Sequence, residues 1–185
     1  MMRVIAGHWK GMRLSTPAGR TIRPTADQVR AALMDTLSPW LPGARFLDLF
    51  AGAGGVGIEA LSRGAAGAIF VEIDPIALAP LRENLRHLGA RDRGRVMRRE
   101  VSEAIEAFKG EGERFKLIFL DPPYGSALAA ETLKRLADGA LLEPDGVVIA
   151  QHLTKEPLPE RFGSLVRWKT RRFGETTLTF FRLGE

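Results

Sequence analysis

A short apolar run that ends at two prolines is the feature that most constrains the fold of this chain. Residues 115–120, Phe-Lys-Leu-Ile-Phe-Leu, hold five apolar side chains in six positions without helical spacing, which is typical of a strand buried on both faces. Pro122 and Pro123 then end the strand, because a proline has no N–H to continue a ladder. With Asp121 and Tyr124 beside them, the run predicts a ligand-binding tip, since open parallel sheets bind ligands at the carboxyl ends of their strands.

The chemistry of this tip suits a planar amine. The carboxylate of Asp121 and the carbonyl of Pro122 are two hydrogen-bond acceptors, and the ring of Tyr124 offers a flat face for stacking. The exocyclic NH2 of a nucleobase turned out of its stack matches both features. These residues alone leave a second interpretation open, which is a plain strand-terminating turn.

The remainder of the chain alternates short apolar strands with helices. We expect strands over 45–50, 68–74, 95–97, 115–120 and 147–150, and helices from Thr25 or Asp27 to Pro39 and over 58–63, 75–88, 101–109 and 127–137. Residues 2–15 predict a small basic hairpin, and residues 165–172 with 176–181 predict an antiparallel pair. This order predicts an α/β fold with a doubly wound, mostly parallel sheet and an antiparallel finish.

A glycine-rich turn follows the first of these strands. Gly52, Gly54 and Gly57 have the spacing of a nucleotide-binding loop, between a strand and a helix. Asp48 just before the turn would repel a pyrophosphate but would attract an ammonium or sulfonium group. Glu72, at the end of the next strand, is placed to accept hydrogen bonds from ribose hydroxyls. A nucleoside with a charged amino-acid tail, S-adenosylmethionine, therefore fits this loop better than a dinucleotide does.

The excess positive charge of the chain, +5 in total, is carried by its two ends. Residues 1–30 hold six basic side chains against one acidic, residues 160–185 hold six against three, and the middle holds fifteen against eighteen. Basic ends on a nearly neutral body indicate a polyanion gripped from the ends. The candidates for RNA contact are Arg3, Trp9, Lys10, Arg13, Arg171 and Arg172. Surface arginines that serve only solubility are the alternative.

Composition excludes several other classes of protein. The 185 residues include no cysteine, which excludes disulfides and thiolate chemistry and favours a cytoplasmic location. No apolar run approaches the ~20 residues of a membrane span, and the N-terminus does not resemble a secretory signal. The three histidines are scattered, so no metal site is expected.

Three motifs in order resemble the amino-group branch of the class I S-adenosylmethionine-dependent methyltransferases: residues 48–54 (Asp-Leu-Phe-Ala-Gly-Ala-Gly), 72–74 (Glu-Ile-Asp) and 121–124 (Asp-Pro-Pro-Tyr). The flanking segments narrow the resemblance. Residues 5–11 (Ile-Ala-Gly-His-Trp-Lys-Gly) and 23–30 (Arg-Pro-Thr-Ala-Asp-Gln-Val-Arg), with Leu-Ser-Arg-Gly-Ala at 61–65, resemble the bacterial 16S rRNA guanine-N2 methyltransferase family. That family modifies a small-subunit rRNA loop near the P site, and the resemblance covers nearly the whole chain.

The resemblance implies a seven-stranded Rossmann-like methyltransferase sheet, with residues 1–22 as a basic hairpin appendage and residues 23–185 as the methyltransferase domain. It implies transfer of a methyl group from S-adenosylmethionine to the N2 amine of a guanine in 16S rRNA, guanine 966 in customary rRNA numbering. So small a protein has little surface with which to read RNA, so we expect an assembled or assembling 30S subunit as the partner. We expect the enzyme to act as a monomer.

The resemblance also implies a set of site residues. The methionine part of the cofactor would be held by Asp48, Phe50, Gly52 and Gly54, with Arg23, Pro24 and Thr25 closing over it. Its ribose would be bound by Glu72. Its adenine would be contacted by Ile73, Glu100 and Val101. Asp121 and Pro122 would hold the target amine, and Tyr124 would stack on the base. The chain departs from the family pattern at Glu100, where Asp or Asn is common, at Ala31 and Met34, where Glu and Phe are frequent, and at Phe173, where Tyr is frequent.

Four other functions remain as alternatives. A DNA N6-adenine or N4-cytosine methyltransferase shares the Asp-Pro-Pro-Tyr tip but usually carries a separate target-recognition domain, for which this chain leaves only short basic ends. A protein-glutamine methyltransferase would give the basic ends no role. A nicotinamide oxidoreductase would leave Asp48 and Tyr124 without a role, and a non-enzymatic RNA-binding module would explain only the ends.

Overall fold

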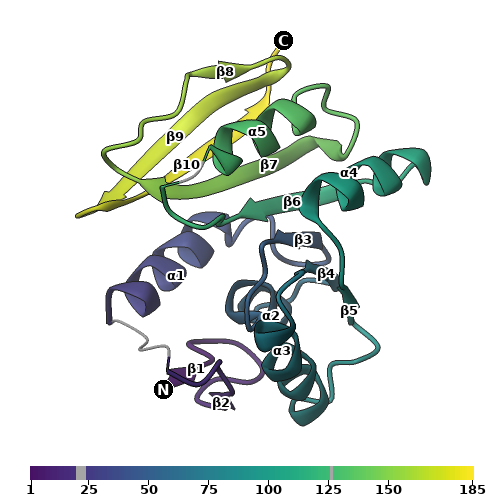
Figure 1. The fold of residues 1–185 in the computed structure, drawn as a ribbon, viewed down its shortest axis with the longest axis vertical. Helices are drawn as coiled ribbons and strands as arrows, with labels where there is room; N and C mark the ends of the chain where they lie inside the picture. Colours follow the sequence, from purple (N-terminus) through teal and green to yellow (C-terminus); the bar gives the residue numbers. More distant parts are fainter. Residues whose placement is uncertain (20–23, 126) are drawn as a thin grey trace.

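The computed structural model describes residues 1–19, 24–125 and 127–185, which form an α/β fold around one large sheet (Figure 1). The strands of this sheet are β3 (Arg45–Leu49), β4 (Gly67–Val71), β5 (Gly94–Met97), β6 (Phe115–Leu120), β7 (Leu142–Leu153), β8 (Arg161–Phe162), β9 (Leu165–Phe173) and β10 (Thr176–Leu183). Their spatial order is β5-β4-β3-β6-β7-β10-β9-β8. Neighbours from β5 to β7 are parallel, and those from β7 to β8 are antiparallel.

This architecture confirms the predicted fold class. Three strands differ from the expectation: β4 ends at Val71 and not at residue 74, β7 is longer, and β8 gives the described sheet eight strands where seven were expected. The strand expected over 147–150 is the centre of a longer β7, which begins at Leu142. Its first residues, Leu-Glu-Pro-Asp-Gly, have the composition of a turn, and the pairing of β7 with β6 shifts register between Phe115 and Leu117. The two-residue β8 was not expected, because two residues carry no periodic pattern.

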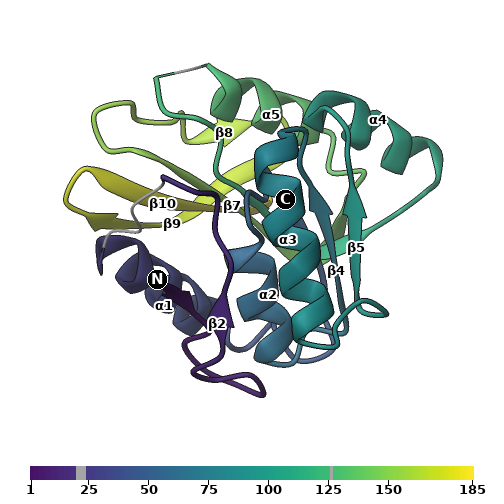
Figure 2. The ribbon, with the colours of Figure 1, turned by 60° about the horizontal axis from the view of Figure 1, so that its bottom comes forward.

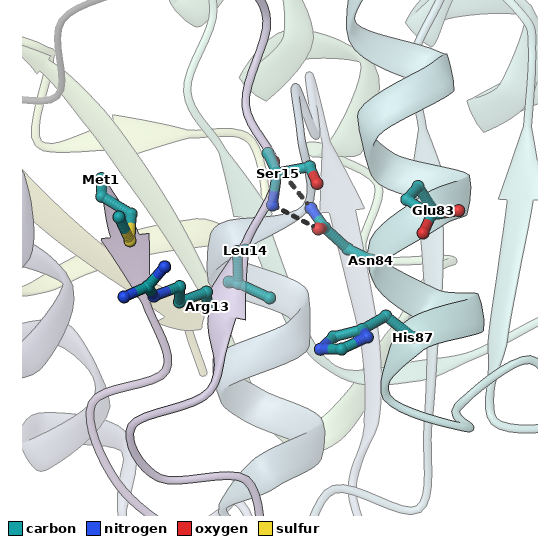
Figure 3. A pocket seen from close by; sticks show the side chains of 7 residues that line it. All are labelled: Met1, Arg13, Leu14, Ser15, Glu83, Asn84 and His87. Atoms are coloured by element: carbon teal, nitrogen blue, oxygen red, sulfur yellow. Dashed lines mark hydrogen bonds between the residues drawn. The ribbon is translucent and has the colours of Figure 1, made fainter.

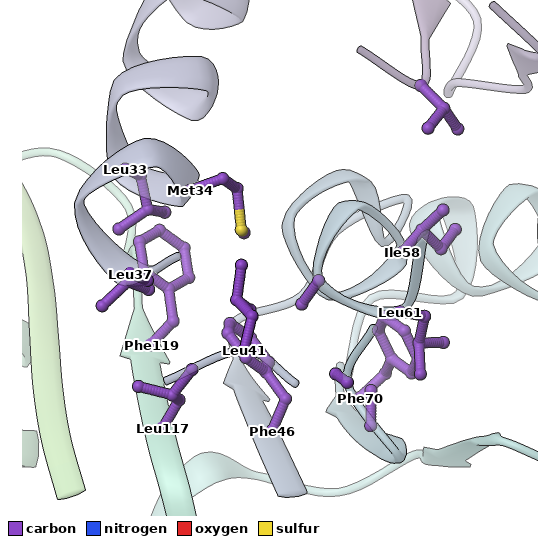
Figure 4. Packing of buried hydrophobic residues seen from close by; sticks show 14 of the residues in the cluster. Leu33, Met34, Leu37, Leu41, Phe46, Ile58, Leu61, Phe70, Leu117 and Phe119 are labelled. Carbon is purple, nitrogen blue, oxygen red and sulfur yellow. The ribbon is translucent and has the colours of Figure 1, made fainter. Parts of the chain in front are cut away.

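Helices cover both faces of the sheet (Figure 2). One face packs against α1 (Pro24–Leu37), α2 (Gly55–Ser62) and α3 (Pro75–His87), and the other packs against α4 (Val101–Gly110) and α5 (Leu128–Leu136). The alternation of side chains along each strand explains the two cores, because Phe46 and Phe119 face the first set of helices while Leu47 and Leu120 face the second. Figure 4 shows Leu33, Met34 and Leu37 of α1 packed toward Leu117 and Phe119 of β6.

The N-terminal hairpin, β1 (Met2–Arg3) with β2 (Arg13–Leu14), packs on the first of these cores. Met2, Val4, Trp9 and Leu14 are all buried there. The hairpin is thus continuous with the body through its apolar side chains. The division of the chain into an appendage and a domain at residue 22 stays a prediction.

The sheet order places two strand ends side by side. β3 lies between β4 and β6, and Leu49, the last residue of β3, pairs with Leu120, the last residue of β6. Residues 50–54 after β3 and residues 121–125 after β6 therefore leave the sheet from neighbouring positions. β3 and β6 are far apart in sequence, so this is the topological switch point of the sheet, where doubly wound folds bind ligands.

Among the described residues, no helix is long and apolar enough to cross a membrane.

Candidate active site

A cavity of about 850 Å³ opens at the carboxyl ends of β3, β6 and β7. Asp48, Asp121 and Tyr124 line it from the first two of these strands, while Gln151 at the end of β7 lines it from the third. Thr16 and Pro17 after the N-terminal hairpin and residues 173–176 at the β9–β10 turn complete its wall. The two strand tips singled out in the sequence therefore meet in one cavity.

The glycine turn between β3 and α2 requires glycine at two positions for different reasons. Gly54 precedes α2 with a φ of 89°, in the left-handed region that disfavours side chains, and a Cβ there would lie 2.4 Å from Leu81. Gly57 lies so close to Phe70 that a Cβ would lie 2.4 Å from its ring. Because Gly57 has no side chain, its N–H can approach Asp48, and the helix starts directly above the end of β3.

Asp48 is a buried carboxyl group on the wall of the cavity. Its side chain is 1% exposed, and Oδ2 accepts a hydrogen bond of 3.0 Å from the N–H of Gly57. The pKa of Asp48 is raised to about 8, mainly by burial; the charges of Asp121 and Glu72 contribute to this rise, and the hydrogen bond from Gly57 opposes it. A group of this kind is a receptor for a cation, because a positive ligand would relieve the cost of the buried charge.

Asp121 faces the same cavity from the end of β6. Burial raises the pKa of Asp121 to about 7, so the group titrates close to neutrality. Pro122 after it is buried, while the ring of Tyr124 is 55% exposed at the rim of the cavity. Next to them, Phe50 lines the cavity with a φ of 61°, a left-handed conformation that costs about 1–3 kcal/mol in a non-glycine residue and is concentrated at functional sites.

Glu72 ties the end of β4 to the glycine turn. Oε2 accepts a hydrogen bond of 2.7 Å from the N–H of Gly52, and Oε1 accepts bonds of 2.8 Å from Ile73 and Asp74. A carboxylate oxygen has two lone pairs, so these bonds leave acceptor capacity for a ligand hydroxyl. Ile73 beside it is 45% exposed.

The adenine-contact candidates lie at the same edge of the sheet, outside the cavity lining. Glu100 is exposed as the N-cap residue of α4, and Val101 is buried at its first position. Of the residues implied to close over the methionine, Arg23 lies outside the described residues. Pro24 and Thr25 begin α1, and their side chains are likewise outside the description.

Trp9 corrects the sequence-based interpretation. We expected an exposed ring that could stack on a base, but the side chain is 7% exposed and belongs to the buried cluster that also contains apolar residues of α2 and α3. The guanidinium of Arg93 lies 5.6 Å from the centre of the ring, and the backbone N–H of Trp9 donates to the hydroxyl of Ser62. The hairpin places Trp9 inward because it must bury an apolar face against the body.

The basic candidates for RNA contact differ in their solvent exposure and in their contacts within the protein. Arg3, Lys10, Arg13 and Arg172 are exposed. Arg171 is half-buried, and its Nη1 donates to the carbonyl of Ala32 and the hydroxyl of Thr36, so it joins β9 to α1. Arg171 thus has a structural role in the described chain, whereas the hairpin arginines and Lys10 face solvent.

A second, smaller cavity of about 410 Å³ lies between the hairpin and α3 (Figure 3). Asn84 on α3 is 1% exposed and exchanges two hydrogen bonds with the backbone of Ser15, at 2.6 and 2.9 Å. Its amide also donates to the carbonyl of Ala53 in the glycine turn, at 3.0 Å. Asn84 therefore fixes the N-terminal segment against the turn that borders the main cavity.

Several contributors to the site were missed in the sequence. Gln151, Glu175 and the Thr16–Pro17 segment line the cavity, but each is a single polar residue or short loop without a local motif. Phe173 was noted only as a departure from a family pattern. For Phe173 and Glu175, the available signal was the predicted antiparallel pair of residues 165–172 and 176–181, whose turn the structure places at the same edge of the sheet.

Known proteins are similar to this chain in sequence and in fold. A family model described as "Conserved hypothetical protein 95" matches residues 2–182. The YlbH protein of Bacillus subtilis is 38% identical over 98% of both chains, and the Escherichia coli protein named "Ribosomal RNA small subunit methyltransferase D" is 36% identical over 85% of this chain and 78% of its own. A solved structure of a hypothetical protein from Thermus thermophilus superposes with a TM-score of 0.85 at 36% identity, over 99% of this chain and all of that one.

Proposed function

This chain belongs to the family described as Conserved hypothetical protein 95, and we propose that it transfers a methyl group from S-adenosylmethionine to the exocyclic N2 amine of a guanine in 16S rRNA, guanine 966 in customary numbering. The relatives from Escherichia coli and Haemophilus influenzae are both named as methyltransferases of small-subunit ribosomal RNA, which supports the rRNA substrate. The choice of guanine and of its N2 amine rests on the sequence resemblance and on the chemistry of the tip.

One observation carries the proposal. Asp48 at the end of β3 and Asp121 at the end of β6 face one cavity, and the exposed ring of Tyr124 stands at its rim. Asp48, which would bind a cation, and Asp121, which would accept hydrogen bonds from an amine, thus line one cavity of about 850 Å³. A dehydrogenase would require neither.

The residues fit S-adenosylmethionine. Asp48 lies in surroundings that raise its pKa to about 8, which suits an ammonium group, and the glycine turn lets a ligand approach the backbone. Glu72 keeps one lone pair, on Oε2, for a ribose hydroxyl, and the exposed side chain of Ile73 would give the adenine an apolar surface. The cofactor supplies a methyl group already activated on a sulfonium centre.

The chain itself must make a poor nucleophile react. The lone pair of a guanine N2 amine is drawn into the ring, so the nitrogen needs an orientation that frees it. Asp121 and the Pro122 carbonyl would accept its two N–H groups, hold the nitrogen in line, and stabilise the positive charge that develops on it. Asp121, with a pKa of about 7, can then take up the proton that the amine loses. Tyr124 would stack on the base at the rim.

A labelled methyl-transfer assay tests the substrate class. The enzyme is given tritiated S-adenosylmethionine with unmethylated assembled 30S subunits, free 16S rRNA or DNA. The proposal predicts label in the ribosomal RNA, with the particle as the better substrate. Label in DNA alone would favour the DNA amino-group methyltransferase that shares the same tip.

Cofactor binding is expected to release a proton from Asp48. At about pH 7 a carboxyl with a pKa of about 8 is mostly protonated, and a bound cation lowers its pKa, so binding of S-adenosylhomocysteine should expel up to one proton. Calorimetry in buffers of different ionisation enthalpy measures this release. In Asp48→Asn the release should disappear and the affinity should fall; a release that is the same in both proteins would assign the proton to another group.

The N-terminal hairpin is expected to contact RNA phosphates. Replacing exposed Lys10 and Arg13 together by alanine should weaken RNA binding and reduce the slope of log K against log salt by roughly 1.4–1.8. Filter binding at several salt concentrations gives both quantities. The matched control replaces Lys134 and Arg135, exposed on α5 across the sheet, and should leave the slope unchanged. An unchanged slope in the hairpin variant would remove this role from the hairpin.

A further inference from the structure

The cavity that holds Asp48 also has a buried cation on its wall. Arg30 on α1 is 6% exposed, yet it lines the same cavity as Asp48, Ala53 and Gly55. Arginine is rarely buried to this degree unless its charge serves a partner. The question is whether the protein itself supplies that partner in full.

The described protein groups satisfy Arg30 only in part. Nη2 donates to the carbonyl of Arg3 at 2.6 Å and lies 3.2 Å from Asp27. Nε is buried without a hydrogen-bond partner among the described residues, 3.7 Å from Glu59. The carboxylate of Glu59 is itself shared, because it accepts two backbone N–H groups and pairs with Arg63 at 3.0 Å. Among the described residues, the guanidinium of Arg30 therefore keeps hydrogen-bonding capacity, at Nε in particular.

The remaining nitrogen of Arg30 lies beside the start of α2. Nη1 is 3.4 Å from the position that a Cβ on Gly55 would occupy. Gly54, the N-cap residue of α2, provides no side-chain cap, and the N–H of Gly57 is taken by Asp48. Gly55 and Val56 in the same first turn both line the cavity. The N-terminal end of a helix attracts an anion, and here a buried guanidinium lies near its first residue, beside the side chain of Met2, whose Sδ is 2.8 Å from the same position.

Opposite charges thus meet on the first turn of α2, with Asp48 bonded to Gly57 and Arg30 beside Gly55. We propose that Arg30 and the uncapped first turn of α2 form a carboxylate subsite, which together with Asp48 recognises the α-amino-acid zwitterion of the cofactor. This inference rests on the proposed function, since the zwitterion is the methionine end of S-adenosylmethionine. Because Arg30 also holds the carbonyl of Arg3, the subsite links the N-terminal hairpin to the cofactor cavity.

A ligand that lacks the carboxylate tests the subsite without any methyl transfer. Calorimetry compares S-adenosylhomocysteine with its decarboxylated analogue, in wild type and in Arg30→Met. Charge-assisted hydrogen bonds of this kind correspond to roughly 10- to 150-fold in affinity. Wild type should therefore prefer the intact ligand by that factor, and Arg30→Met should bind both ligands with nearly equal affinity. A loss that is the same for both ligands would contradict the subsite.

Two further variants separate binding from folding. Arg63→Met removes the other guanidinium on Glu59 but does not touch the cavity, so it should keep the wild-type preference. Arg30→Lys retains the positive charge but not the planar guanidinium, so it should keep part of the preference for the intact ligand. This variant tests the subsite even if Arg30→Met does not fold. Wild-type protein that binds neither ligand would contradict the proposed function as well. Wild type that binds both equally would contradict the subsite alone.

Discussion

Asp121→Ala is expected to lower the rate of methyl transfer by roughly 100- to 1000-fold, while the affinity for S-adenosylhomocysteine is retained. Asp121 directly follows β6 and lines the cavity where we propose the base binds, whereas Asp48 is the carboxylate proposed to bind the ammonium group of the cofactor. Removing an acceptor that stabilises charge formed only in the transition state lowers the rate and leaves ground-state binding of the cofactor intact. Single-turnover rates on 30S subunits and calorimetry on the same preparations measure the two quantities.

The matched control is Asp145→Ala. Asp145 is an exposed aspartate on β7 that pairs with Lys116 and does not line the cavity, so its loss should leave the rate unchanged. An Asp121→Ala enzyme that methylates as fast as wild type would remove Asp121 from the mechanism. A loss of cofactor affinity equal to the loss of rate would instead give Asp121 a role in shaping the cofactor cavity.

Glu59→Ala is expected to destabilise the fold by about 3–5 kcal/mol. Glu59 on α2 is completely buried, and its two oxygens accept the N–H groups of Ile5 and Ala6 at 2.9 Å while facing Arg30 and Arg63. Without the carboxylate, two half-buried donors and two guanidinium groups lose their partner at once. Urea unfolding of the wild type and the variant gives the difference.

Glu106→Ala serves as the control for this change. Glu106 is also a helical glutamate paired with an arginine, but the pair with Arg135 is exposed and spans 3.8 Å, so little stability should be lost. Equal unfolding midpoints for Glu59→Ala and wild type would show that the hairpin is held by its apolar side chains alone.

The strands that carry the site could be predicted because their signal is local. The apolar run before Asp121 and the glycine turn after Asp48 each define a strand end within a few residues, and parallel strands bring such ends to one edge. The register that pairs Leu49 with Leu120 confirms that the two ends are neighbours. Physical rules for parallel sheets therefore predict that Asp48 and Asp121 share one edge, and the strand order of the structure makes them neighbours there.

The features that escaped prediction depend on residues far apart in the chain. Glu59 bonds to backbone groups more than 50 positions away, and Asn84 joins Ser15 to Ala53. Neither residue differs locally from a solvated polar residue on a helix. Trp9 was placed on the surface for the same reason, because its neighbours Lys10 and Arg13 are exposed while its own ring faces the core. Buried polar networks and the inward side chain of a turn residue have no periodic signature.

The most direct test of the proposed function is the identity of the methylated nucleoside. Unmethylated 30S subunits are incubated with the enzyme and S-adenosylmethionine, the 16S rRNA is digested to nucleosides, and the products are separated by mass spectrometry. The proposed function predicts N2-methylguanosine, formed by wild type and strongly reduced in Asp121→Ala. A methylated adenosine or cytidine in its place, or an equal yield of N2-methylguanosine from both proteins, would contradict the account.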